Sequence, residues 1–180
     1  MQADTMAPLI LTLEFEAPYQ DWAQALRTQY FPPERNIVPA HVTLFHALPP
    51  DVSQAIQLRL RQRMDAPGVR IDAPYSLGRG VAFRIHSAGL STLRASIVSL
   101  VGRDVLTRQD AAAWRPHLTV QNKVEPDRAR RLLRDLTEGF EPIVTNAAAL
   151  NLWRYEGGPW TLIERFPFGG EGERSECSAA

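Results

Sequence analysis

The sequence predicts an α+β protein built from two copies of one strand–helix–strand–helix–strand unit. Two observations predict this fold class: a four-residue string containing His and Thr occurs twice, and the elements around each string follow the same order. Apolar residues alternate in the expected strands and recur every three or four residues in the expected helices. With 180 residues, the chain is long enough to bury one substantial core.

The first copy contains the string His41-Val42-Thr43-Leu44. Residues i and i+2 of a strand share a face, so His41 and Thr43 project together while Val42 and Leu44 turn toward the core. The expected elements are, in order, a strand at Leu9–Phe15, a helix near Asp21–Tyr30, a strand at residues 41–44, a helix from Pro50-Asp51 to Met64, and a strand at Val69–Leu77.

The second copy contains the string His117-Leu118-Thr119-Val120, which repeats the same arrangement. A Pro-Asp pair lies nine and ten residues after each histidine and opens a helix, where proline costs no backbone hydrogen bond. The expected elements are a strand at Val81–Ile85, a helix near Gly89–Val101, a helical turn at Asp110–Trp114, a strand at 117–120, a helix from Pro126-Asp127 to Leu136, and strands at Ile143–Trp153 and Trp160–Phe166.

Composition narrows the classes of partner and cofactor. The formal net charge is zero, which argues against broad electrostatic binding of long nucleic acids. The single cysteine, Cys177, gives little support to a disulfide, a zinc site or thiol catalysis. The N-terminus lacks a signal-peptide pattern and no apolar run is long enough to span a membrane, so we expect a cytoplasmic protein. We expect one domain over residues 1–168 and a flexible tail over 169–180.

Two His-x-Thr strands suit acid–base chemistry on a phosphodiester. Histidine titrates near neutrality, so one neutral ring can take a proton from the attacking water while a protonated ring donates one to the leaving oxygen. The hydroxyls of Thr43 and Thr119 can donate hydrogen bonds to the non-bridging phosphate oxygens. Such a site needs no metal, and neither histidine has a carboxylate cluster beside it in the sequence. Histidines that merely end strands are the structural alternative, which the matching His and Thr pairs make improbable.

The two strings resemble the paired signatures of the two-histidine (2H) phosphoesterase superfamily, in its branch of 2′-5′ RNA ligase-like proteins and RNA 2′,3′-cyclic phosphodiesterases. The resemblance covers about residues 8–168 and includes Pro116 and the Gly157–Trp160 turn. It implies a bilobed, pseudo-twofold fold with mostly antiparallel sheets around a central cleft. It implies catalytic His41 and His117, with His41 as acid and His117 as base, and Thr43 and Thr119 as phosphate-binding residues. Residues 45–48 and 121–123 depart from the family pattern, which leaves substrate preference open.

The resemblance also implies an activity: metal-independent hydrolysis of a 2′,3′-cyclic or 2′-5′-linked phosphate, with no cofactor. The expected partner is a small nucleotide or an RNA 3′ end, and we expect a monomer without membrane contact. Two alternatives stay open. The same site could join RNA ends as a reversible 2′-5′ ligase, or it could bind nucleotides or RNA without catalysis.

Four further residues are candidates for substrate binding. Phe45 and Gln121 lie four residues after their histidines and share the site face if the strands stay regular. Phe45 could stack on a nucleobase or simply pack in the core. Arg115, two residues before His117, could reach the phosphate, although Pro116 could disturb the alternation. Tyr155 could contact a ligand, although aromatic residues in hairpins more often support packing.

Other polar residues near the strings favour structural roles. His46 lies an odd number of residues after His41, so it should face away from the site as a core or strand-end histidine. His86 ends its strand and is similarly interpreted as structural. Arg84 and Arg154 are weaker candidates for ligand contact, because each could be a solvated strand residue.

Overall fold

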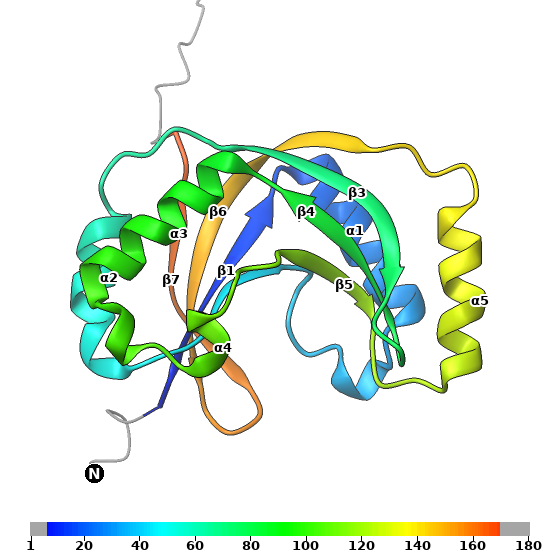
Figure 1. Cartoon of the computed structure of the whole chain (residues 1–180), viewed down its shortest axis with the longest axis horizontal. Coiled ribbons are helices and arrows are strands. Elements are labelled where there is room, and N and C mark those ends of the chain that lie inside the picture. The colour runs from blue at the N-terminus through cyan, green and yellow to red at the C-terminus, as the bar shows by residue number, and fades with distance from the viewer. Residues whose placement is uncertain (1–6, 170–180) are drawn as a thin grey trace, which may run out of the picture.

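The computed structural model describes residues 7–169 and contains seven strands and five α-helices in that range (Figure 1). The strands are β1 (Leu9–Phe15), β2 (Val42–Leu48), β3 (Gly68–Ser76), β4 (Val81–His86), β5 (His117–Gln121), β6 (Ile143–Tyr155) and β7 (Trp160–Pro167). The helices are α1 (Ala17–Tyr30), α2 (Ser53–Leu60), α3 (Ala88–Val101), α4 (Arg108–Ala111) and α5 (Pro126–Thr137), with 3₁₀ turns at Pro33–Arg35, Pro50–Val52 and Arg103–Val105.

The strands form one antiparallel sheet that closes on itself. Its order is β1-β2-β5-β4-β3-β6-β7, and β1 also pairs with β6, so six strands complete a ring while β7 extends β6. Exchanging β1 with β4, β2 with β5, and β3 with β6 reproduces the same ring. The α+β fold with duplicated halves is therefore confirmed.

The helices connect the two halves rather than staying with their own strands. Helix α1 of the first half packs against β5 of the second half, α5 packs against β3, and α2 packs against α3. Figure 1 shows α5 at one end of the molecule and α2 with α3 at the other. The core between helices and sheet is apolar and includes fully buried Phe15, Phe83 and Ile56. The two sequence repeats are thus interlocked around one continuous core.

Three helices differ in extent from those expected, and the first of them, α1, begins at Ala17 rather than near Asp21. Helix α2 ends at Leu60, and Met64 lies beyond it, where its carbonyl accepts a hydrogen bond from the Gly169 N–H. The helical turn expected at 110–114 begins earlier, at Arg108, because the Thr107 hydroxyl caps it by accepting from the Asp110 N–H at 3.2 Å. The Thr107 cap is a local side-chain contact, and the Met64 hydrogen bond joins distant parts of the main chain; apolar periodicity reveals neither.

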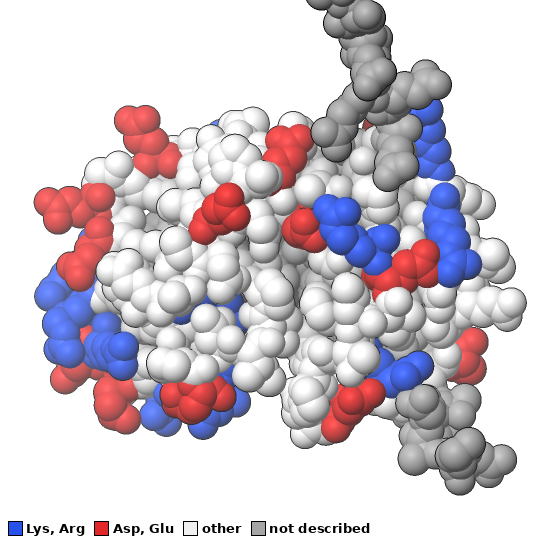
Figure 2. All heavy atoms as spheres, turned by 180° about the vertical axis from the view of Figure 1, so that it is seen from behind, with Lys and Arg blue, Asp and Glu red and all other residues white. Residues whose placement is uncertain are grey.

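Charged side chains are mixed on the face of the molecule seen in Figure 2, where basic and acidic groups are interspersed. No helix among the described residues has the length and apolar character needed to cross a membrane. The tail expected to be flexible lies, apart from Gly169, outside the described residues. The single domain over 1–168 and the cytoplasmic location stay predictions.

Candidate active site

The two His-x-Thr strings lie on neighbouring antiparallel strands. Strands β2 and β5 pair only at Val42 and Leu118, the residues between His and Thr in each string. Antiparallel register then places His41 opposite Thr119 and Thr43 opposite His117, all on the face that Val42 and Leu118 do not occupy. Both apolar residues are fully buried, whereas the four polar residues are partly exposed. The fold therefore brings the four predicted residues together around one point of near-twofold symmetry.

Both imidazoles are held in the same way. Nδ1 of His41 lies 2.6 Å from the carbonyl oxygen of Pro39, and Nδ1 of His117 lies 2.9 Å from that of Arg115. A carbonyl oxygen only accepts, so each Nδ1 carries the proton and donates it. In the neutral ring, Nε2 then carries the lone pair that can accept a proton. In the charged ring, Nε2 carries a proton that it can donate. Each histidine is thus fixed in the tautomer needed for proton transfer through Nε2.

The two histidines have different neighbours. Burial lowers the pKa of His41 to about 4, and the charges of Arg27, His117 and His46 act in the same direction, against its hydrogen bond to Pro39. Its ring centroid is 5.2 Å from that of Trp160 on β7. At neutral pH, His41 of the free protein is therefore uncharged.

A tyrosine and two arginines lie around His117. The ring of Tyr75 on β3 meets that of His117 edge-on, with 6.5 Å between centroids. Arg84 pairs with His117 in the β4–β5 register, and its guanidinium carbon lies 4.7 Å from the centre of the Tyr75 ring. Arg115, a predicted ligand residue, lines the same cavity as Tyr75 and Arg84.

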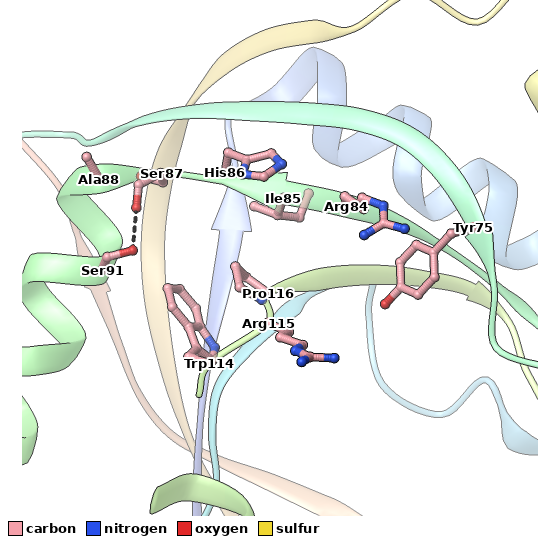
Figure 3. A pocket seen from close by; sticks show the side chains of 10 residues that line it. All are labelled: Tyr75, Arg84, Ile85, His86, Ser87, Ala88, Ser91, Trp114, Arg115 and Pro116. Carbon is pink, nitrogen blue, oxygen red and sulfur yellow. Dashed lines mark hydrogen bonds between the residues drawn. The ribbon is translucent and has the colours of Figure 1, made fainter. Parts of the chain in front are cut away.

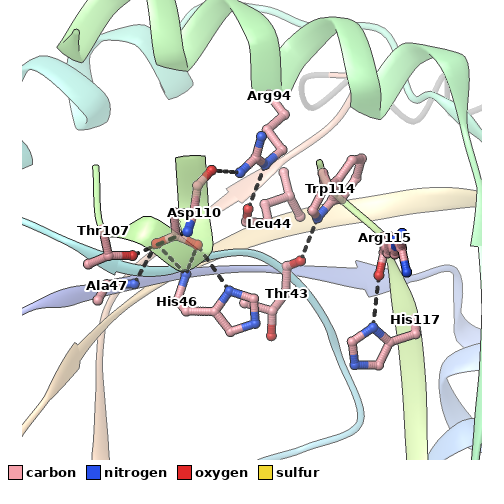
Figure 4. A network of polar contacts seen from close by, with 10 residues as sticks. All are labelled: Thr43, Leu44, His46, Ala47, Arg94, Thr107, Asp110, Trp114, Arg115 and His117. Atoms are coloured by element: carbon pink, nitrogen blue, oxygen red, sulfur yellow. Dashed lines mark hydrogen bonds and ion pairs between the residues drawn. The ribbon is translucent and has the colours of Figure 1, made fainter. Parts of the chain in front are cut away.

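Fully or partly buried side chains fix the backbone of both signature strands. Arg27 of α1 donates to the carbonyl of Thr119 at 3.0 Å and to that of Val38 at 3.2 Å, and burial lowers its pKa to about 10. On the other strand, Arg94 of α3 donates to the carbonyl of Leu44 at 2.9 Å, and Trp114 Nε1 donates to that of Thr43 at 3.0 Å (Figure 4). Each signature strand is therefore held by an arginine from the opposite half of the sequence.

Two predicted ligand residues, Phe45 and Gln121, lie in the core instead of on the site face. In β2, Thr12 pairs with Thr43 but Leu11 pairs with Phe45, which marks a bulge; in β5, Ala82 pairs with Thr119 but Val81 pairs with Gln121. A bulge inserts one residue and reverses the alternation beyond it. Phe45 is consequently fully buried and Gln121 is 1% exposed. The shared site face was expected only for regular strands, and the bulges remove that condition; for Phe45 the structure agrees with the alternative of core packing.

The same bulge corrects the orientation of His46. Its side chain lies on the same side of β2 as Thr43, not on the opposite face as expected (Figure 4). Nδ1 of His46 lies 3.0 Å from Asp110 Oδ1, and this buried carboxylate also accepts from the His46 and Ala47 N–H groups. Burial opposes ionisation of Asp110, but these hydrogen bonds outweigh it and keep its pKa below the usual value. Sequence alternation gave no signal for this pair.

The remaining candidates lie at the edges of the site. Tyr155 is exposed and pairs across the β6–β7 hairpin with Trp160, and it is the Trp160 ring that contacts His41. His86 is exposed, with Nε2 at 3.2 Å from an Asp72 carboxylate oxygen. In residues 7–169, no group of three or more His, Cys, Asp or Glu side chains is placed to hold a metal ion. Metal independence of the reaction stays a prediction.

Comparison with known proteins identifies the family. Escherichia coli LigT complexed with 3′-AMP superimposes with a TM-score of 0.58 at 16% sequence identity, covering 91% of this chain and 98% of LigT. The protein TT0787 of Thermus thermophilus gives a TM-score of 0.59 at 18% identity, covering 92% of this chain and 100% of TT0787. No curated protein sequence matches significantly. The family model of the 2′-5′ RNA ligase superfamily matches residues 15–159. The chain therefore belongs to the 2′-5′ RNA ligase superfamily of two-histidine phosphoesterases.

Proposed function

We propose that this protein is a metal-independent phosphodiesterase that hydrolyses a 2′,3′-cyclic or 2′-5′-linked phosphate of RNA ends or nucleotides. The observation that carries the proposal is the symmetric placement of His41, Thr43, His117 and Thr119 about the Val42–Leu118 pair. Each half supplies one imidazole with a free Nε2 and one hydroxyl on the same face. A phosphate between them would meet a proton acceptor on one side and a proton donor on the other.

In the proposed reaction, a neutral imidazole removes a proton from water as the water oxygen bonds to phosphorus. The bond from phosphorus to the ribose 2′ or 3′ oxygen breaks, and the imidazolium protonates that leaving oxygen. The Thr43 and Thr119 hydroxyls stabilise the non-bridging oxygens. Because its low pKa leaves His41 uncharged in the free protein, we assign His41 as the base and His117 as the acid. This order reverses the one implied by the family resemblance.

The test is turnover of adenosine 2′,3′-cyclic phosphate in the presence of EDTA. We expect His41→Ala and His117→Ala each to lower kcat by about 10²- to 10⁴-fold, the usual contribution of a general acid or base. Thr43→Val and Thr119→Val should lower it as well, while Thr28→Val, at an exposed position on α1, serves as the matched control. Full turnover by both histidine variants would contradict the proposal.

Product analysis separates the alternatives. Incubation with two RNA ends should yield opened monomeric ends; a new 2′-5′ junction would instead identify a ligase. Binding of a cyclic nucleotide without conversion would identify a binding module. To assign the roles, the pH profile of kcat/KM is measured for the wild type: an acidic limb well below pH 6.5 supports His41 as the base.

A further inference from the structure

A cavity of about 800 Å³ lies beside His117 and outside the four-residue centre. It is lined by strand β4, the start of α3, Tyr75 of β3 and the segment that leads into β5 (Figure 3). Arg84 and Arg115 line it, and both connect directly to His117: Arg84 is its register partner, and the Arg115 carbonyl accepts from its Nδ1. The cavity therefore lies next to one side of the proposed active site.

Two positive charges act at this cavity. The Arg84 guanidinium lies over the Tyr75 ring, and Figure 3 shows the Arg115 side chain extending toward the Tyr75 hydroxyl. Burial raises the pKa of Tyr75, while the charges of both arginines oppose that rise, so both act on the same hydroxyl. Two guanidinium groups and one hydroxyl thus face a common space, as a phosphate site requires.

Neither guanidinium has an ion-pair or hydrogen-bond partner among residues 7–169. The other arginines near the site differ: Arg27 and Arg94 donate to main-chain carbonyls, and Arg165 donates to Glu14 at 3.0 Å through both Nε and a terminal nitrogen. Arginine forms its strongest contacts in bidentate pairs with carboxylates and phosphates. The Arg84 and Arg115 side chains therefore keep this capacity for a ligand.

Comparison of the two halves shows that the pair Arg84 and Arg115 is present only beside His117. Leu13 pairs with Val42, as Phe83 pairs with Leu118, so Glu14 occupies the position in the first half that Arg84 occupies in the second. Glu14 is negatively charged at neutral pH, and its hydrogen bonds to Arg165 lower its pKa further. A second anionic group of a substrate therefore finds, beside His117, two guanidinium groups without ion-pair partners among the described residues. On the side of His41 it finds a carboxylate that is already paired with Arg165.

We propose that Arg84, Arg115 and Tyr75 form a subsite for a second phosphate group, which the substrate carries next to the phosphate that is cleaved. The inference rests on the proposed function, because it places the cleaved phosphate between the histidines. It names the substrate class as nucleotides or RNA ends with at least two phosphates, in preference to nucleoside 2′,3′-cyclic monophosphates. It also fixes the orientation: the second phosphate lies on the His117 side.

The experiment measures binding of unreactive product mimics to the full chain by isothermal titration calorimetry. Adenosine 3′-monophosphate carries one phosphate, and adenosine 3′,5′-bisphosphate carries a second. A dinucleotide with a 3′-phosphate tests whether the internucleotide phosphate of RNA can take the place of the 5′-phosphate. We expect the wild type to bind the bisphosphate about 10- to 100-fold more tightly than the monophosphate, as hydrogen bonds between charged groups predict.

The variants Arg84→Gln and Arg115→Gln should each remove most of this preference, measured within each variant as the ratio of its affinities for the bisphosphate and the monophosphate. Arg84→Lys should keep part of it, since lysine retains the charge but not the bidentate geometry. Arg128→Gln on α5 is the matched control for loss of an exposed positive charge. Thermal unfolding verifies that the variants fold, as expected for exposed side chains.

The outcomes separate this inference from the proposed function. Equal affinity of the wild type for the monophosphate and the bisphosphate would overturn the second subsite and leave the catalytic proposal intact. A preference that survives both Arg84→Gln and Arg115→Gln would overturn the assignment to these residues. Failure of every phosphorylated nucleotide to bind would overturn both proposals. If the wild type binds the dinucleotide more tightly than the monophosphate and the two arginine variants do not, the source of the second phosphate is RNA.

Discussion

Protonation of His41 should destabilise the folded protein, and the size of the effect follows from its surroundings. Burial lowers the pKa of His41 from 6.5 to about 4, a difference of about 2.5. One pKa unit corresponds to about 1.4 kcal/mol, which gives an upper limit of about 3 kcal/mol. His41 keeps part of its surface exposed, and solvent screening reduces the effect to about 1–3 kcal/mol.

The direction of the effect follows from proton linkage. The folded state holds His41 neutral, whereas the unfolded chain protonates it below about pH 6.5. The contribution to stability is therefore fully present above pH 6.5 and is lost as the pH falls from 6.5 to about 4. Replacing His41 by glutamine removes this titration but leaves the other groups in place, so the difference between the two proteins isolates His41.

Denaturant unfolding of the wild type and of His41→Gln between pH 7.5 and pH 4 measures this difference. We expect the stability of the wild type relative to the variant to fall by about 1–3 kcal/mol over that range. Histidine NMR titration provides an independent check of the same group. A stability difference that stays constant, or a His41 resonance that titrates at or above pH 6.5, would refute the reasoning.

Two further predictions concern the side chains that hold the signature strands. Arg27→Met should lower the free energy of unfolding by about 2–5 kcal/mol, because it leaves the carbonyls of Val38 and Thr119 without their donor. Arg27→Lys should recover only part of this loss. The melting temperature should fall by about 2–4 °C per kcal/mol. Asp110→Asn should cost about 1–3 kcal/mol at neutral pH, because its amide cannot accept every hydrogen bond that the carboxylate accepts from His46 and Ala47. The pKa of Asp110 is lowered in the fold, so this cost should shrink in urea titrations as the pH falls below about 4. A cost that does not change with pH would contradict the role of the charge.

Local pattern was sufficient to predict the order of the main elements and the two strings that the fold brings together. Alternation in residues 41–44 and 117–120 needs only the two-residue period of a strand, and both strings form or adjoin strands in the structure. The repeated Pro-Asp pairs marked true helical starts, as a 3₁₀ turn in the first half and as α5 in the second. The duplication then implied that His41 and His117 occupy corresponding positions. These features depend on neighbours in sequence, which is why the sequence reveals them.

Which other side chains lie around the site depends on tertiary structure. The bulges after Thr43 and Thr119 move Phe45 into the core and leave His46 on the side of the site, because one added residue reverses every later side chain. Asp110 meets His46 across 64 residues of chain.

The positively charged side of the site also depends on tertiary structure. Tyr75, Arg84 and Arg115 come together only because β4 lies between β3 and β5 in the closed ring. Local sequence was enough to locate the two strings and the His and Thr side chains that each presents. The pairing of distant strands determined which half is positively charged, because that depends on contacts whose partners no local pattern specifies.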